Sequence, residues 1–245
     1  MKKNLALVLL LLASISAWGA VALDPNLAGN WVAFKGANIS SLTTPNIPVS
    51  AGANRLLLCG AIYDTGNANP AAAVSTATFN GTAMSLLDSQ RIALVDGKAV
   101  AELWFLKNPA NTSAPVIVNW SASVADGAAI CWAFTGANQS STFGSVAKGG
   151  GAGAGDPSIT VGSQSGAIVA EFTFYDGPFA PHCLAASSWP LQAGCTEASR
   201  SQARYPVFAS QLKFTGSTTV PMDWDMTGSA GGGRGSSIVA VSINP

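Results

Sequence analysis

The sequence contains little charge and almost no histidine. Only 10% of its 245 residues are Asp, Glu, Lys or Arg, and His182 is the single histidine. A typical soluble domain has about 25% charged residues. The 12 basic and 12 acidic side chains balance, so the chain lacks the basic excess of a nucleic-acid-binding protein and the acidic excess of a disordered tail. The scarcity of histidine and carboxylates argues against hydrolytic and metal chemistry.

Motifs of several catalytic or metal sites are also missing. No CxxC pair or His/Cys cluster indicates zinc, and no G-x-S-x-G motif surrounds a serine that His182 would activate. The glycine-rich stretch at 148–155 lacks the Lys-Ser/Thr end and the helix of a phosphate-binding loop, which favours a crossover loop. We therefore expect no cofactor and no metal. Calcium is the alternative, on Asp223 and Asp225 of the Asp223-Trp224-Asp225 segment, alone or with Asp64 and Asp176 from other loops.

The N-terminus has the three parts of an export signal. Two lysines precede an apolar run at 5–13, and Ala20-Val21-Ala22 supplies the small residues that a signal peptidase reads. We therefore expect a signal peptide over 1–22. A transmembrane anchor is the alternative, but it needs about 20 apolar residues, and Ser14, Ser16 and Gly19 break the stretch after residue 13. No other segment is long and apolar enough to span a bilayer, so we expect a secreted, extracellular or cell-surface protein, with the periplasm as an alternative.

Export would place the four cysteines in an oxidising compartment. Cys183 and Cys195 flank a short segment rich in Pro, Ser and Ala, a spacing that suits a loop-closing disulfide. Cys59 and Cys131 each lie inside a predicted strand, where they bridge two strands or remain buried thiols. Four cysteines allow three pairings, and sequence alone selects none of them. The spacing favours the bridge between Cys183 and Cys195 first.

Short β-favouring runs alternate with turns along the mature chain. No window keeps the 3.6-residue apolar period of a helix. Asn80-Gly81 and Asp96-Gly97 separate strand-like runs and predict tight hairpins, because these residue types accept positive φ. About ten strands at this spacing predict an all-β, two-sheet antiparallel sandwich. We expect one such domain over 23–245, with an N-terminal arm at about 23–49 that pairs within its own subunit or with a neighbour's open edge.

The alternation of side chains assigns the faces of two predicted strands, 99–106 and 167–175. On one face of each strand all the side chains are apolar, and we expect the larger of them to line the core: Leu103, Phe105, Ile168, Phe172 and Phe174. The opposite faces carry polar and aromatic side chains, which we expect on outward or cleft-facing surfaces: Glu102, Trp104, Glu171 and Tyr175.

Five motifs follow one another in a recognisable order. They are N-R-L-L-L at 54–58, F-N-G-T-A-M at 79–84, A-E-L-W-F-L-K-N-P-A at 101–110, V-I-V-N-W-S at 116–121 and A-F-T-G-A at 133–137. This order resembles the jelly-roll β-sandwich modules of bacterial secreted and cell-surface proteins and of phage tail-associated proteins. The resemblance covers about 54–137, and 160–245 only as a strand pattern. It implies a jelly-roll fold and, in a largely uncharacterised family, a role in adhesion, carbohydrate contact or structure.

The composition favours association between copies of the chain. Low charge with abundant Ala, Gly, Ser and Thr is common in exported proteins that pack against themselves, and a net charge near zero weakens mutual repulsion. We predict a secreted, non-catalytic structural or adhesive extracellular subunit that self-assembles into a filament, an oligomer or a surface polymer, without a nucleic-acid partner.

Two other functions remain as alternatives. The first is a carbohydrate-binding module, whose candidate ring platforms are Trp189, Trp104 and Tyr175, with Trp189 the best exposed because of its loop position. The second is a glycoside-active enzyme that uses Glu102 and Glu171. Glycosidases use two carboxylates about 5 to 10 Å apart, but the E-x-D-x-x-E motif of sandwich glycosidases is missing here.

Overall fold

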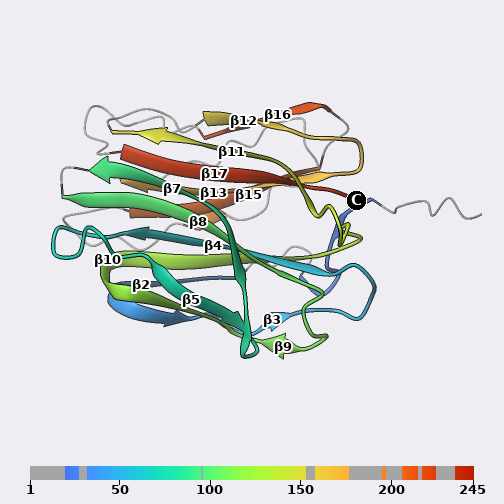
Figure 1. The fold of residues 1–245 in the computed structure, drawn as a ribbon, viewed down its shortest axis with the longest axis horizontal. Helices are drawn as coiled ribbons and strands as arrows, with labels where there is room; N and C mark the ends of the chain where they lie inside the picture. The colour runs from blue at the N-terminus through green and yellow to red at the C-terminus, as the bar shows by residue number, and fades with distance from the viewer. Residues whose placement is uncertain are drawn as a thin grey trace, which may run out of the picture.

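The computed structural model describes residues 20–27, 32–94, 96–152, 158–176, 195–196, 206–214, 217–224 and 235–245. These residues form 17 strands, β1 to β17, and the strands that pair do so in the antiparallel sense. The prediction of an all-β antiparallel sandwich is confirmed, although the strands are more numerous than expected. No helix that could cross a membrane occurs in the described ranges. Figure 1 shows the strands stacked in layers.

The larger sheet has eight strands. Its main order is β6-β5-β10-β4-β8-β7, and β1 and β2 also pair with β10. The bounds are β1 Ala22–Leu23, β2 Val32–Thr43, β4 Leu56–Asp64, β5 Val74–Phe79, β6 Thr82–Ala83, β7 Ser85–Leu94, β8 Gly97–Lys107 and β10 Val116–Thr135. The 20 residues of β10 serve two layers, because its first part pairs with β5 and its last part with β4. β2 follows both parts of β10, so the sheet curls over itself.

The smaller sheet has five strands in the order β11-β17-β13-β15-β14. Their bounds are β11 Phe143–Gly151, β13 Ile168–Asp176, β14 Cys195–Thr196, β15 Pro206–Phe214 and β17 Gly235–Ile243. Two separate ribbons complete the fold: β12 (Ser158–Gly162) with β16 (Thr219–Asp223), and β3 (Ile47–Pro48) with β9 (Ser113–Ala114).

Three apolar cores made of described residues lie between these layers. The central core lies between the two sheets, where β4, β8 and β10 pack against β13, β15 and β17. A second core fills the curl of the larger sheet. A third, smaller core lies between the smaller sheet and the β12–β16 ribbon, which stands at one end of the stack in Figure 1. The central strands are therefore covered on both faces, which explains why all nine residues of β4 and all nine of β17 are buried.

The two sheets repeat one strand arrangement. In the larger sheet, β4 is paired along its full length by β10 on one side and by β8 on the other. In the smaller sheet, β17 and β15 pair with β13 in the same way. The outer strands also correspond, because β2 and β11 flank β10 and β17, while β7 and β14 flank β8 and β15. The second half, which the motifs describe only as a strand pattern, thus has the strand order of the first.

Both predicted hairpins are present. Asn80 and Gly81 have φ values of 48° and 75°, and Phe79 pairs with Thr82 across them, as expected for a two-residue loop that needs positive φ. In the second hairpin, Leu94 pairs with Gly97. Gly97 is therefore the first residue of β8, whereas the prediction placed it in the loop.

The described part of the N-terminal arm pairs within its own chain. β1 and β2 pair with β10, and β3 pairs with β9. Of the predicted core residues, Leu103, Ile168, Phe172 and Phe174 are fully buried. Phe105 is half-buried and packs edge-on against Phe143, with ring centroids 4.8 Å apart.

Gly60 allows the two sheets to approach. A Cβ at this position of β4 would lie 2.1 Å from a ring carbon of Phe172 on β13, so any side chain would force the sheets apart. We expect Gly60→Ala to lower the free energy of unfolding by about 1–3 kcal/mol, as overpacking of a core does. Denaturant unfolding measures this change. Gly151→Ala is the matched control, because nothing lies within 4 Å of its Cβ, and an equal loss in the control would contradict the explanation.

Candidate functional site

The polar and aromatic residues expected on outward faces are instead inside the protein. Glu102 is 4% exposed and Trp104 9% exposed, and Glu171 and Tyr175 are fully buried. The assignment of each to the face opposite the central core is correct, but the expectation of an outward or cleft-facing surface is wrong. The reason is that the curl of the larger sheet covers Trp104, while the β12–β16 ribbon packs on the smaller sheet at Val169 and Ala240, next to Glu171.

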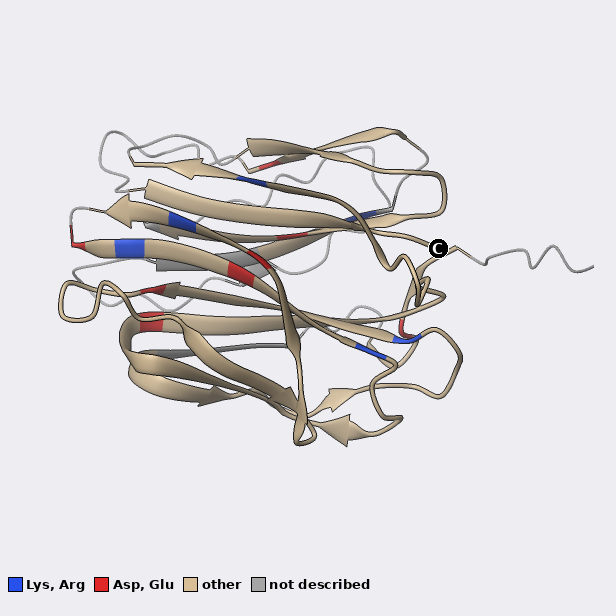
Figure 2. Ribbon diagram, viewed as in Figure 1, with Lys and Arg blue, Asp and Glu red and all other residues tan. Residues whose placement is uncertain are grey.

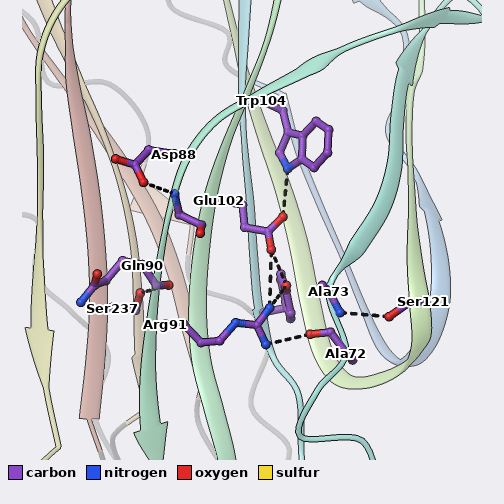
Figure 3. A network of polar contacts seen from close by, with 11 residues as sticks. Ala72, Ala73, Asp88, Gln90, Arg91, Glu102, Trp104, Ser121 and Ser237 are labelled. Carbon is purple, nitrogen blue, oxygen red and sulfur yellow. Dashed lines mark hydrogen bonds and ion pairs between the residues drawn. The ribbon is translucent and has the colours of Figure 1, made fainter.

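Glu102 is the centre of a polar network in the curl (Figure 3). Its Oε1 accepts a hydrogen bond from the Tyr63 hydroxyl at 2.6 Å, and its Oε2 accepts one from Trp104 Nε1 at 3.0 Å. Arg91 Nη2 lies 3.7 Å from Glu102 Oε1 and donates to the Tyr63 hydroxyl at 3.0 Å. Three neighbouring strands, β4, β8 and β7, are therefore joined through one carboxylate.

Arg91 extends this network to the loop before β5. Its Nη1 donates to the carbonyl of Ala72 at 2.9 Å, and its guanidinium lies 6.0 Å from the centre of the Tyr63 ring. Burial, together with the charge of Glu102, raises the pKa of Tyr63 well above its ordinary value, so the phenol stays protonated and keeps donating to the carboxylate. The described charged residues are few and scattered over the fold (Figure 2), and here two of them form an internal link.

Glu171 has a comparable network under the β12–β16 ribbon. Its carboxylate accepts hydrogen bonds from Thr173 Oγ1, Gln211 Nε2 and Trp224 Nε1. Gln211 lies on β15 and Trp224 directly follows β16, so the carboxylate joins the smaller sheet to the ribbon that covers it. The backbone carbonyl of Glu171 accepts from Ser210 Oγ at 2.6 Å.

The environment of Glu171 favours its protonated form. Burial raises its pKa to about 7, because the loss of hydration outweighs the three donors and the nearby Lys213 ammonium. Burial also lowers the pKa of Lys213, against the opposing charges of Asp223 and Glu171. Lys213 Nζ donates to the carbonyl of Pro221, which adds another bond between the sheet and the ribbon.

Glu102 and Glu171 do not form a catalytic pair. They lie in different sheets and point away from the central core in opposite directions, Glu102 into the curl and Glu171 toward the ribbon. Sheets packed face to face are about 10 Å apart, so the two carboxylates are further apart than the roughly 5 to 10 Å that glycosidases need. The expectation of a glycosidase site on these residues is therefore wrong.

The only disulfide among the described residues joins Cys59 on β4 to Cys131 on β10. The two residues are direct partners in the ladder, with Cα atoms 4.1 Å apart, close to the spacing of a non-hydrogen-bonded antiparallel pair. Both side chains are buried in the core of the curl. Of the two alternatives for these cysteines, the bridge between strands is confirmed.

Several predicted site residues lie outside the described part of the chain. These are His182, Cys183, Trp189, Asp225 and the side chains of Asp176 and Cys195. Two candidate calcium ligands are described: Asp64 accepts from Gly66 N at 2.8 Å, and Asp223 accepts from Ser158 Oγ. No group of three or more His, Cys, Asp or Glu side chains is arranged for a metal ion in the described ranges.

Sequence reasoning missed four members of the two networks: Tyr63, Arg91, Gln211 and Trp224. They are far from the glutamates along the chain and belong to other strands or follow them, so no local motif connects them. The comparisons with protein-family models, curated proteins and solved structures give no match.

Protonation of Glu171 should make stability depend on pH. Between its ordinary pKa of 4.5 and about 7 only the folded state binds this proton. The free energy of unfolding should therefore fall as pH rises through this window, by at most about 3 kcal/mol, and level off above it. Chemical unfolding at pH 4.5, 6 and 8 measures this. Glu171→Gln should flatten the dependence, whereas Asp223→Asn should preserve it. A Glu171→Gln profile parallel to that of the native protein would refute the assignment.

Removal of the Glu102 carboxylate should lower the free energy of unfolding. Glu102→Ala leaves the Tyr63 hydroxyl, the Trp104 indole N–H and the Arg91 charge without their common acceptor, and we expect a loss of about 3–5 kcal/mol in the free energy of unfolding. Asp88→Ala is the control, because the Asp88–Lys148 pair is partly exposed and such pairs contribute about 1 kcal/mol or less. Similar losses in the two variants would show that the network is not a structural link.

Proposed function

We propose that this protein is a secreted, non-catalytic structural or adhesive subunit that acts outside the cell. The observation that carries this proposal is the use of its buried polar groups. Both buried carboxylates accept hydrogen bonds from donors inside the protein. Glu102 joins neighbouring strands of the larger sheet, and Glu171 joins the smaller sheet to the ribbon that covers it. Buried polar networks whose members are satisfied rigidify a core, and a rigid sandwich suits a subunit that bears load or presents a surface.

The buried disulfide supports the location outside the cell. Disulfides persist in oxidising compartments and are rare in the cytosol. The bridge between Cys59 and Cys131 agrees with the export signal expected at the N-terminus. The near balance of charges in the sequence weakens repulsion between copies, which supports an assembly of many subunits.

Strand β2 provides an edge for assembly. Among the described strands it pairs with β10 only, so its other edge has no strand partner there. Its segment 37–43 has no charged residue and no proline, which are the residues that usually protect such edges. Ala37, Ser40 and Ser41 are exposed. Asn38 has a φ of 51°, and the register with β10 shifts between Ile39 and Ser41. A second copy can add a strand here by β-augmentation.

Charge placed on this edge should reduce assembly. We expect the mature protein to form oligomers or filaments whose mass rises with concentration, and Ser41→Lys to weaken this association by about tenfold or more, because a lysine on an edge opposes strand addition. Static light scattering and negative-stain electron microscopy of the untagged protein measure the effect. Ser165→Lys, on an exposed turn, is the matched control for net charge.

Two results would contradict parts of this proposal. If Ser41→Lys assembles as well as the native protein does, the β2 edge is not the contact. If the native protein is a monomer at all concentrations, self-assembly is wrong, and a glycan-binding screen with Trp189→Ala then tests the carbohydrate-binding alternative.

A further inference from the structure

The segment that contains the expected cleavage site is part of the folded protein. Val21 is 3% exposed and packs in the central core, and its backbone N–H donates to the carbonyl of Gly166 at 3.1 Å. Ala22 and Leu23 form β1, which pairs with Thr135 and Phe134 at the end of β10. The sandwich therefore continues up to and beyond the bond between Ala22 and Leu23.

Hydrogen bonds of Asp24 fix the position of the chain just after this bond. Its side chain is fully buried, and its carboxylate accepts from the backbone N–H of Ser50 at 2.7 Å, from the Ser50 hydroxyl and from the backbone N–H of Asn26 at 3.0 Å. Its own N–H donates to the carbonyl of Ala133 at 2.8 Å. These bonds involve no residue before Leu23, so they are available with or without the segment that precedes it.

The fold conflicts with proteolysis at this bond. Ala20 and Ala22, the small residues that the peptidase reads, are exposed, but Val21 between them points into the core. A protease cleft binds the residues around the cut bond in extended form, which requires their backbone groups and both side-chain faces. In the folded protein the backbone of Ala22 and Leu23 is paired with β10, and the side chain of Val21 is packed in the central core. Cleavage therefore requires β1 to leave the sandwich.

We propose that the bond between Ala22 and Leu23 is a processing site that folding closes. A chain that is cut before it folds is released from residues 1–22, whereas a chain that folds first keeps them. Hydrolysis by a signal peptidase adds one water across the bond and leaves a carboxylate on Ala22 and an ammonium group on Leu23. This inference rests on the export that we propose above, and it adds an order of events, cleavage before folding.

The test compares the same precursor in two states. The full-length chain, made without export and oxidised in detergent micelles, is treated with purified signal peptidase either folded or immediately after dilution from urea. Mass spectrometry measures the rate at which a chain beginning at Leu23 appears. We expect the folded precursor to be cut at least about tenfold more slowly, because cleavage must wait for local opening.

Two variants make the result specific. Val21→Ser keeps both alanines but weakens the packing of residue 21 in the central core. The folded variant should therefore be cut faster than the folded native chain. Circular dichroism verifies that the variant folds. Ala22→Phe removes a small residue that the peptidase requires, so it should remain uncut in both states. Equal cleavage of folded and unfolded native precursor would overturn the closure by folding while leaving export intact. No cleavage of the unfolded precursor would overturn the processing site and the export signal together.

Discussion

The covering of both faces of the central strands is the constraint on which the rest of the structure depends. β4 and β13 each lie between two apolar cores, so each must fit neighbours on both sides. Gly60 is a consequence, since only the lack of a side chain lets Phe172 pack against the larger sheet. The buried glutamates are another, because a polar group enclosed between two layers must find its partners inside the protein.

The two halves solve the same packing problem with different chemistry. Cys59 on β4 and Glu171 on β13 occupy corresponding places. Cys59 lies between β10 and β8, and Glu171 lies between β17 and β15, which are the corresponding strands of the smaller sheet. In the first half this place holds a disulfide to Cys131. In the second it holds a carboxylate bound by Gln211 and Trp224. One link is covalent and independent of pH, whereas the other weakens as Glu171 loses its proton with rising pH.

Much of the fold could be predicted from local patterns. Alternating side chains and Asn-Gly or Asp-Gly turns indicated antiparallel strands and two hairpins, because both signals act within a few residues. The same alternation placed Phe172 and Glu171 on opposite faces correctly. It could not show that the face of Glu171 is covered, because the cover is a ribbon of β12 and β16 that lies elsewhere in the chain. The candidate site was therefore only half predictable: the two glutamates were found, but their partners and their separation were not.

The sequence by itself determined the all-β class and the low charge of the chain, because composition and short-range periodicity carry these properties. Only the tertiary structure decided that Cys59 meets Cys131, that Glu102 and Glu171 face away from each other, and that Val21 belongs to the core. Each of these depends on which strands become neighbours. Strand pairing joins residues far apart in the chain, and its register is set by the packing of whole layers and not by any local segment.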